Sequence, residues 1–290
     1  MAKFRVGSWH WMPPLVALLL CVLVAASGSN QQLFLQLNLA GGALGAHFWM
    51  PLTMLGDGAV ALALVLPCIR RSPRCFWAAL IAAVLTGLWV QGLKHTVHLP
   101  RPPAVFGPGQ FHLAGPGYRG VSFPSGHAAA IFALVGIWVM GLALRPLVRV
   151  LLLVLATLVS LSRVMVGVHW PLDILWGMLI GWMAALAGLA LYPRLGWSTS
   201  GWAGRAAGCV LLAVAGTLLF SHHLKMPAVL PLQRVLGAVC LVWGALEMLR
   251  MVARGPPSRQ PHRWLTLKRR APLKRARIPD SRESGSTIPD

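Results

Sequence analysis

The stretch LSRVMVGVHWPLDILWG, residues 161–177, places three ionisable side chains inside a long apolar region. Arg163, His169 and Asp173 fall within eleven positions, although the whole chain of 290 residues contains only six acidic residues. A charged side chain near the centre of a bilayer costs at least about 2.5–3.5 kcal/mol. Because charged side chains are so unfavourable inside a membrane, we predict that these three residues belong to a functional site.

The rest of the chain is apolar enough to place this stretch in a membrane. The sequence is 57% hydrophobic and only 11% charged, and its apolar residues gather in long blocks. A helix needs about 20 apolar residues to cross about 30 Å of hydrocarbon. Eight blocks approach that length, at residues 12–27, 51–69, 76–93, 125–144, 147–161, 171–191, 206–220 and 235–249. We therefore expect an all-α fold, a polytopic membrane helix bundle.

The formal charge of +20 is distributed unevenly between the two sides of such a bundle. If the N-terminus is cytoplasmic and all eight blocks span, twenty of the 26 Lys and Arg residues lie on the inner side and six on the outer side. This is the positive-inside pattern, and it predicts cytoplasmic N- and C-termini. No nucleic-acid-binding motif accompanies the charge, so we expect no nucleic-acid partner.

The two ends of the chain leave alternatives open. The first block resembles a signal peptide, but we expect it to be retained as a membrane helix. Residues 251–290 are rich in Arg and Pro, which indicates a disordered cytoplasmic tail that anchors the topology. The same basic residues could bind anionic lipid head groups.

Three unusual polar segments fall on the same predicted outer face. They are KHTVHLPRP (residues 94–102), SFPSGHAAA (122–130) and the stretch from Ser162 to Asp173. The first opens a connection rich in Pro and Gly that runs from Lys94 to Phe123. A long loop inside a compact bundle is usually functional or disordered, and the basic residues favour function.

The middle segment has the chemistry of a phosphate site. Pro124 suits the first turn of a helix, where its missing N–H would be unpaired anyway. Ser125 and Gly126 would then leave backbone N–H groups free at a positive helix end, which favours an anion. His127 would stand beside that anion and could give or accept a proton. We interpret Ser122 as a helix cap.

The opening stretch supplies a second histidine and a carboxylate. His169 and Asp173 are four positions apart, so on a helix they would lie on one face. A carboxylate bonded to one imidazole nitrogen fixes the tautomer and leaves the other nitrogen free to attack. Because Arg163 and His169 are six positions apart and poorly aligned on one helix, the chain should turn near Gly167. Which of the two histidines would be the nucleophile is left open by the spacing.

Basic and acidic residues complete the expected constellation. Lys94, Arg101 and Arg163 would neutralise phosphate oxygens, and the two arginines could bind in fork geometry. Asp57 could pair with a basic residue of the site or with a polar group of a neighbouring helix. Glu247 is expected to form a local ion pair near the inner face.

The motifs K-x6-R-P at Lys94–Pro102, P-S-G-H at Pro124–His127 and S-R-x5-H-x3-D at Ser162–Asp173 are complete and in order. This three-part pattern resembles the signature of the type-2 phosphatidic acid phosphatase superfamily, which also includes bacterial acid phosphatases and vanadium haloperoxidases. The resemblance covers roughly residues 56–181. It implies a six-helix core, so the last two helices would be additions.

The resemblance also implies a mechanism, namely metal-independent hydrolysis of a phosphate ester or diphosphate through a phosphohistidine. His169 would be the nucleophile, Asp173 its orienting partner and His127 the acid that protonates the leaving group. Phosphate binding would fall to five residues: Lys94, Arg101, Ser125, Gly126 and Arg163. It implies neither a metal nor a cofactor, because the built-in cations supply the charge.

Together these patterns predict an integral-membrane lipid phosphatase of a bacterial inner membrane, with its site facing the periplasm. We divide the chain into residues 1–50 (first helix and interfacial segment), 51–192 (phosphatase core), 193–250 (two further helices) and 251–290 (tail). Undecaprenyl diphosphate, phosphatidylglycerol phosphate, phosphatidic acid and lipid A are all compatible substrates, with a lean towards the first. A lipid phosphotransferase, an anionic-lipid transporter and a phosphatase for a soluble substrate such as a sugar phosphate are the alternatives, and the oligomeric state stays open.

Overall fold

The computed structural model describes residues 7–118, 120–221 and 227–253, and within them the fold is all-α. Six helices are long and apolar enough to cross a membrane: α1 (Ser8–Ala26), α6 (Pro73–Thr96), α9 (Pro146–Met165), α10 (Pro171–Leu195), α11 (Trp202–Phe220) and α12 (Leu230–Ala253), the last preceded by a 3-10 turn, η1 (Pro227–Val229). The fourth predicted block forms the shorter helix α8 (Gly126–Gly141). The protein is therefore a polytopic α-helical membrane bundle.

The second predicted block is not one helix, which corrects the expectation for residues 51–69. It forms three short helices, α3 (Gly45–Leu55), α4 (Gly58–Ala63) and α5 (Cys68–Arg71). Asp57 causes the break, because its side chain caps α4 by accepting hydrogen bonds from the N–H groups of Ala59 (2.9 Å) and Val60 (3.3 Å). The carboxylate also lies within electrostatic range of Arg163, which favours the expected link to the site over a polar neighbour elsewhere.

The centre of the bundle is α10, which packs most extensively on α8 and α6 and also contacts α1. Gly177 and Gly181 allow this close contact, since a Cβ at either position would lie 2.5 Å or less from the carbonyl oxygens of Ser125 and Ala129 on the α8 side. Small residues four positions apart let two membrane helices approach through their backbones. The approach fixes the start of α8 against the start of α10.

Helices α11 and α12 pack on each other and against α4 and α5. Glu247 of α12 is fully buried and pairs with Arg70, Arg71 and Arg250. The expected local pair with Arg250 is therefore present, and the two α5 arginines attach the last helices to the rest of the bundle.

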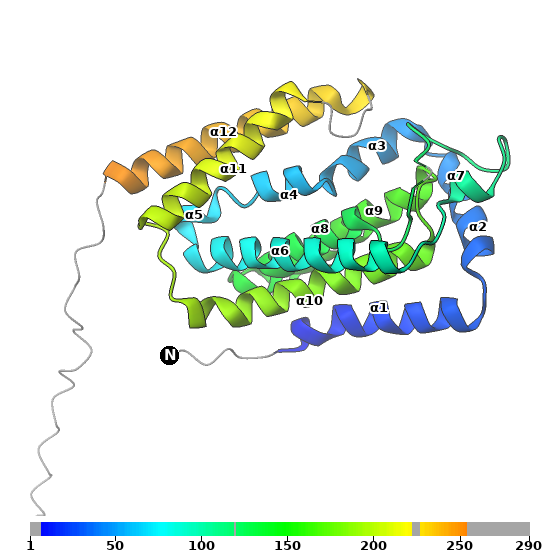
Figure 1. Ribbon diagram of the computed structural model, residues 1–290, viewed down its shortest axis with the longest axis horizontal. Helices are drawn as coiled ribbons and strands as arrows, with labels where there is room; N and C mark the ends of the chain where they lie inside the picture. The colour runs from blue at the N-terminus through cyan, green and yellow to red at the C-terminus, as the bar shows by residue number, and fades with distance from the viewer. Residues whose placement is uncertain (1–6, 119, 222–226, 254–290) are drawn as a thin grey trace, which may run out of the picture. The chain divides into compact units, whose positions relative to one another are not determined.

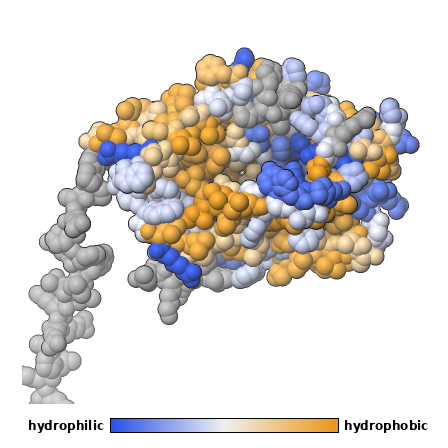
Figure 2. All heavy atoms as spheres, in the orientation of Figure 1, coloured by the Kyte–Doolittle hydropathy of each residue, from blue (hydrophilic) through white to orange (hydrophobic). Residues whose placement is uncertain are grey.

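The ends of the helices separate into two sets (Figure 1). The connection between α6 and α8, the turn between α9 and α10, and the short helices α2 (Asn30–Gly42) and α7 (Pro102–Val105) gather at one end. Figure 2 shows the largest hydrophilic patch toward this end, while hydrophobic residues cover most of the middle. The segment 31–49, expected to lie along the outer interface, forms α2 and the first part of α3 there. Residues 222–226 and the basic tail from residue 254 lie outside the described residues.

Candidate active site

The three polar segments singled out in the sequence meet at this end of the bundle. The connection from α6 folds back on itself, because Pro100 and Val121 form an isolated antiparallel bridge and the N–H of Ser122 donates to Leu99 O over 2.8 Å. The indole N–H of Trp170 donates to Pro100 O over 2.7 Å. The loop that carries Arg101 is thereby held against the turn that carries His169.

His169 and Asp173 form the buried pair at the centre of the site, with 2% and 1% of their side chains exposed. His169 precedes α10 and Asp173 lies in its first turn, so the pair straddles the helix start and does not lie along one helix face. The distance from His169 Nδ1 to Asp173 Oδ2 is 3.1 Å, and the N–H of Trp170 donates to the same oxygen over 2.9 Å. The expected turn is present at Gly167, whose φ of +81° favours glycine. The second ring nitrogen, Nε2, faces away from Asp173 and toward Arg101.

Ser122 belongs to this centre, and its interpretation as a helix cap is wrong. The serine is fully buried, and its hydroxyl donates to Asp173 Oδ2. Its oxygen is 3.4 Å from His169 Nδ1. The cap of α8 is Ser125 instead, and the chain between the two serines turns Ser122 inward. The carboxylate thus has a second fixed donor that the motif spacing did not indicate.

Two arginines approach the histidine from different directions. Arg101 Nη1 lies 3.3 Å from His169 Nε2 and donates to Val168 O over 3.1 Å, and Arg101 Nε donates to Val121 O. Arg163 is buried, with 3% exposed, and its Nη1 donates to Thr53 Oγ1 over 3.1 Å. Lys94, at the end of α6, lines an outward cavity of about 390 Å³ together with Arg101. All three predicted cations are therefore near the pair.

The start of α8 differs from the prediction at two positions. Pro124 lies before the N-cap and outside the first turn, because Ser125 is the N-cap and accepts from Ala128 N–H over 3.5 Å. The N–H of Ser125 is not free, since it donates to Asp173 O over 3.0 Å and ties α8 to α10. The backbone N–H groups of Gly126 and His127 have no acceptor among the described residues. Within the part of the chain that the structure describes, the N–H groups of this helix end that remain without an acceptor are therefore those of Gly126 and His127.

His127 faces the same centre. Its Nε2 atom is buried and has no hydrogen-bond partner among the described residues. The ring lies within electrostatic range of Arg163, His169 and Arg101. Gly56 packs directly on it, because a Cβ at Gly56 would come within 3.0 Å of His127 Cβ. A buried imidazole beside the pair, without a hydrogen-bond partner among the described residues, is placed to exchange a proton with a bound group.

Two supporting residues come from segments before the recognised motifs. Thr53 of α3 accepts from Arg163 and also from the hydroxyl of Ser162, over 2.9 Å. Asn38 of α2 is fully buried, and its amide donates to the carbonyls of His112 (2.9 Å), Val164 and Met165 (3.0 Å each). Its carbonyl accepts from His112 N–H over 2.7 Å. One side chain thus joins α2, the long loop and the turn before His169. In the sequence, the sign of this role was a polar Asn within an otherwise apolar segment.

Charge and burial set the protonation of the nucleophile candidate. Burial first, and then the positive charges of Arg101, Arg163 and Lys94, lower the pKa of the His169 imidazole well below its usual value. The ring is therefore neutral at pH 7, with a lone pair available for attack. Burial also lowers the pKa of Arg101, but a guanidinium stays protonated in proteins.

Fold and site together define a polytopic membrane protein with a buried His–Asp pair and a set of cations suited to a phosphate. Residues 75–197 match the family model described as the PAP2 superfamily, and this segment is a PAP2 superfamily domain. It begins near the start of α6 and ends just after α10. Thr53, Gly56 and Asn38, which support the site, lie before it.

Individual relatives carry lipid phosphatase names. The chain is 31% identical over 142 residues to an undecaprenyl-diphosphatase of Sulfolobus acidocaldarius, covering 49% of this chain and 62% of the relative. It is 38% identical over 78 residues to phosphatidylglycerophosphatase B of Escherichia coli, covering 26% and 31%. It is 31% identical over 115 residues to a lipid A 1-phosphatase of Rhizobium etli, covering 39% and 48%. The matches thus span less than two thirds of each of these relatives.

A solved structure extends the likeness to the fold. The crystal structure of LpxE from Aquifex aeolicus superposes with a TM-score of 0.51 at 27% identity, covering 56% of this chain and 94% of that one. The shared fold thus accounts for just over half of the chain.

Proposed function

We propose that the protein is an integral-membrane lipid phosphatase that hydrolyses a phosphate monoester or diphosphate through a phosphohistidine. The observation that carries the proposal is the orientation of His169. Its Nδ1 faces Asp173 and Ser122, while its Nε2 faces Arg101. The nitrogen that can attack is therefore next to a cation that would hold the phosphoryl group.

In the first step, Nε2 of His169 would attack phosphorus while the bond from phosphorus to the leaving oxygen breaks. Asp173 would accept the hydrogen bond from Nδ1–H and stabilise the positive charge that develops on the ring. His127 would deliver a proton to the leaving oxygen. Arg101, Arg163 and the N–H groups at the start of α8 would bind the equatorial phosphate oxygens, whose charge grows in the transition state.

In the second step, water would attack the phosphohistidine. His127 would take a proton from that water, inorganic phosphate would leave, and His169 would return to its neutral form. Water would be the only co-substrate of the complete reaction. The chain's own cations supply the charge stabilisation in both steps.

The lipid nature of the substrate is supported by where the site lies. The candidate site is at one end of the membrane-length helices, and a lipid presents its phosphate at the membrane surface. The relatives at 31–38% identity are named for lipid substrates. Both observations favour a phosphorylated lipid over a soluble sugar phosphate.

The test is phosphate release by the detergent-purified full chain in EDTA, from undecaprenyl diphosphate, phosphatidylglycerol phosphate, phosphatidic acid and lipid A. We expect release from at least one lipid, and its loss in His169→Ala. Acid-labile, base-stable radiolabel on the protein after quenching would report the phosphohistidine. Phosphate release that is unaffected by the mutation would contradict the phosphohistidine mechanism. Transfer of the phosphate to an added acceptor lipid would identify a phosphotransferase.

The same proposal places the protein in a bacterial inner membrane with the site facing the periplasm and both termini in the cytoplasm. The support is the excess of Lys and Arg on the side opposite the site. Reporters inserted within residues 105–117 and fused after residue 288 test the orientation. An external signal from the second fusion would refute it.

A further inference from the structure

The short helix α2 lies across the end of the bundle that carries the candidate site (Figure 1). It precedes the segment 75–197 that matches the family model. Three of its side chains, Asn30, Phe34 and Asn38, are spaced four residues apart and therefore lie on one face of the helix. Phe34 and Asn38 are fully buried, so this face is packed against the rest of the protein.

Asn38 holds the chain before His169. Its amide group donates to Val164 O and Met165 O, each over 3.0 Å. Both carbonyls belong to the last turn of α9, where backbone carbonyls have no α-helical donor. Arg163, which is expected to bind the phosphate, directly precedes them in the chain. The amide therefore fixes the end of the helix that carries this arginine.

The same side chain also holds the long loop over the turn at Gly167. The Asn38 amide donates to His112 O over 2.9 Å, and its carbonyl accepts from His112 N–H over 2.7 Å. A Cβ at Gly167 would lie 2.6 Å from His112 O, so the loop is in close contact with the turn. The loop and the turn thus share one anchor on α2.

Asn30 and Phe34 hold the chain directly after His169. Asn30 Oδ1 accepts a hydrogen bond from Leu172 N–H over 3.0 Å. Leu172 lies in the first turn of α10, where backbone N–H groups have no acceptor within the helix, so Asn30 caps that helix from a distant segment. The ring of Phe34 packs edge-on against Trp170, with 5.1 Å between the ring centroids. These two residues fix the start of α10, which carries the carboxylate of the pair.

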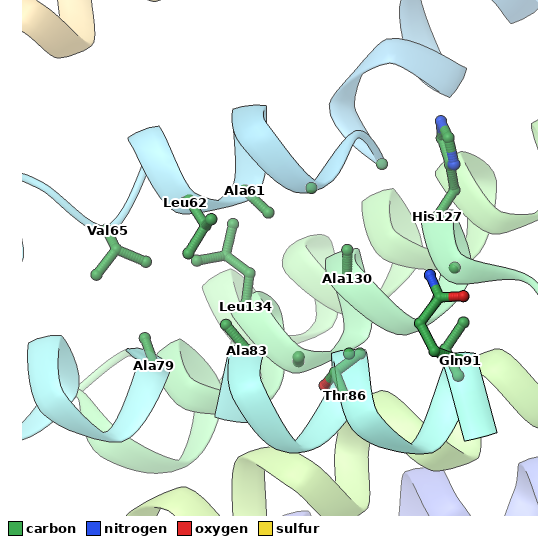
Figure 3. Close-up of a pocket in the computed structure, with 16 residues that line it drawn as sticks. Ala61, Leu62, Val65, Ala79, Ala83, Thr86, Gln91, His127, Ala130 and Leu134 are labelled. Carbon is green, nitrogen blue, oxygen red and sulfur yellow. The ribbon is translucent and has the colours of Figure 1, made fainter. Parts of the chain in front are cut away.

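The two cavities beside the site are formed without α2. The outward polar cavity is lined by residues between Gln91 and Val121. An apolar cavity of about 340 Å³ reaches the site at His127, and Figure 3 shows its walls formed mainly by α4, α6 and α8. Among the described residues, none from α2 lines either cavity. A contribution of α2 to the reaction therefore acts through the backbone that it holds.

We propose that α2 is a brace for the catalytic centre, in which Asn38 and Asn30 are positioning residues that hold Arg163 and His169 from both sides of the turn. The inference rests on the proposed phosphatase function and deepens it. Attack on phosphorus requires the nucleophile and the phosphate ligands to be aligned, and a displacement of about 1 Å can lower the rate about a hundredfold. Asn38 is needed as a donor, because its amide partners are carbonyls, whereas Asn30 is needed as an acceptor.

Substitution by Asp separates the two roles, because Asp keeps an acceptor oxygen and loses the amide donors. Asn38→Asp and Asn38→Leu should both lower the rate constant of phosphate release at least about tenfold. Asn30→Ala should lower it at least about threefold. Asn30→Asp should stay within about twofold of wild type, since a carboxylate is favoured at the start of a helix.

The measurement is single-turnover phosphate release, with the full chain in excess over the lipid in detergent micelles. Its rate constant does not depend on the fraction of the protein that is folded, so a loss of stability alone does not change it. The lipid is whichever of undecaprenyl diphosphate, phosphatidylglycerol phosphate, phosphatidic acid and lipid A the wild-type protein hydrolyses fastest.

Gln233→Leu is the matched control for Asn38→Leu. Gln233 is also a buried amide that donates to carbonyls at the end of another helix, namely Leu218 O over 2.8 Å and Ser221 O over 2.6 Å. We expect both leucine variants to lower the thermal stability, because each leaves buried carbonyls without a donor. The rate constant of Gln233→Leu should stay at the wild-type value.

The outcomes separate the brace from the phosphatase proposal. Equal rate constants for Asn38→Leu and Gln233→Leu would overturn the brace and leave the phosphatase proposal intact. An equal loss in Asn30→Asp and Asn30→Ala would overturn the role of Asn30. If the wild-type protein releases phosphate from none of the four lipids, the phosphatase proposal itself fails, and the brace fails with it.

Discussion

Replacing Ser122 by Ala removes the hydroxyl that donates to Asp173 Oδ2 from a fully buried position. The residues expected to contact the phosphate are unchanged. Asp173 Oδ2 then keeps two neighbours, the Trp170 N–H at 2.9 Å and His169 Nδ1 at 3.1 Å. A hydrogen bond to a charged group contributes about 1.5–3 kcal/mol. Because the two remaining neighbours hold the carboxylate in place, we expect a loss near the lower limit, roughly tenfold in kcat.

The assay is steady-state phosphate release from the preferred lipid, with kcat and KM determined separately. KM should stay within about twofold, because Ser122 supports the orienting carboxylate and does not face the phosphate. Ser160→Ala is the matched control, since Ser160 is equally buried but donates to Ala156 O within α9. If Ser122→Ala and Ser160→Ala had equal kcat values, the assignment of Ser122 to the catalytic centre would be refuted.

Three further predictions follow from single contacts. Thr53→Val removes the acceptor that holds Arg163 and should lower kcat/KM about five- to tenfold; an unchanged value would mean that Arg163 is positioned without it. The lowered pKa of His169 keeps its imidazole neutral below pH 6.5, so kcat/KM should hold as pH falls to that value and decline only as pH passes through the lowered pKa; a decline centred at or above pH 6.5 contradicts this. Glu247→Gln removes the partner of Arg70 and should cost about 1–3 kcal/mol of stability, less than for a fully buried pair because Arg70 is 31% exposed; a thermal melt of the detergent-purified protein that matches wild type would show that the cluster contributes little.

The sequence was sufficient for the class of fold and for most of the site. Only α-helices and closed β-barrels satisfy all backbone hydrogen bonds inside a membrane. Apolar blocks that approach 20 residues have the length of a membrane helix and not of a barrel strand, so the sequence alone indicated a helical membrane protein. Lys94, Arg101 and Arg163 were predictable as members of one polar site because charge at membrane depth is too costly to be incidental. His169 and Asp173 were predictable as a pair from their spacing, although the structure places them around a helix start.

What the sequence did not disclose depends on contacts between segments far apart in the chain. Ser122 looked like a cap because capping is the local role of serine, and only the fold brings it to a carboxylate 51 positions later. The N–H of Ser125 looked free for the same reason, until packing of α8 on α10 gave it an acceptor. The second block looked continuous because apolar composition hides the capping role of Asp57.

The division follows from the physics of each kind of information. Burial of apolar surface and the cost of charge are properties of residue type, so composition and spacing alone determined a membrane protein and predicted an anion site in it. A hydrogen-bond partner is a property of position in space, and Asn38 and Thr53 take their roles from segments that only the packed bundle brings together. Tertiary structure therefore decided how the site is held.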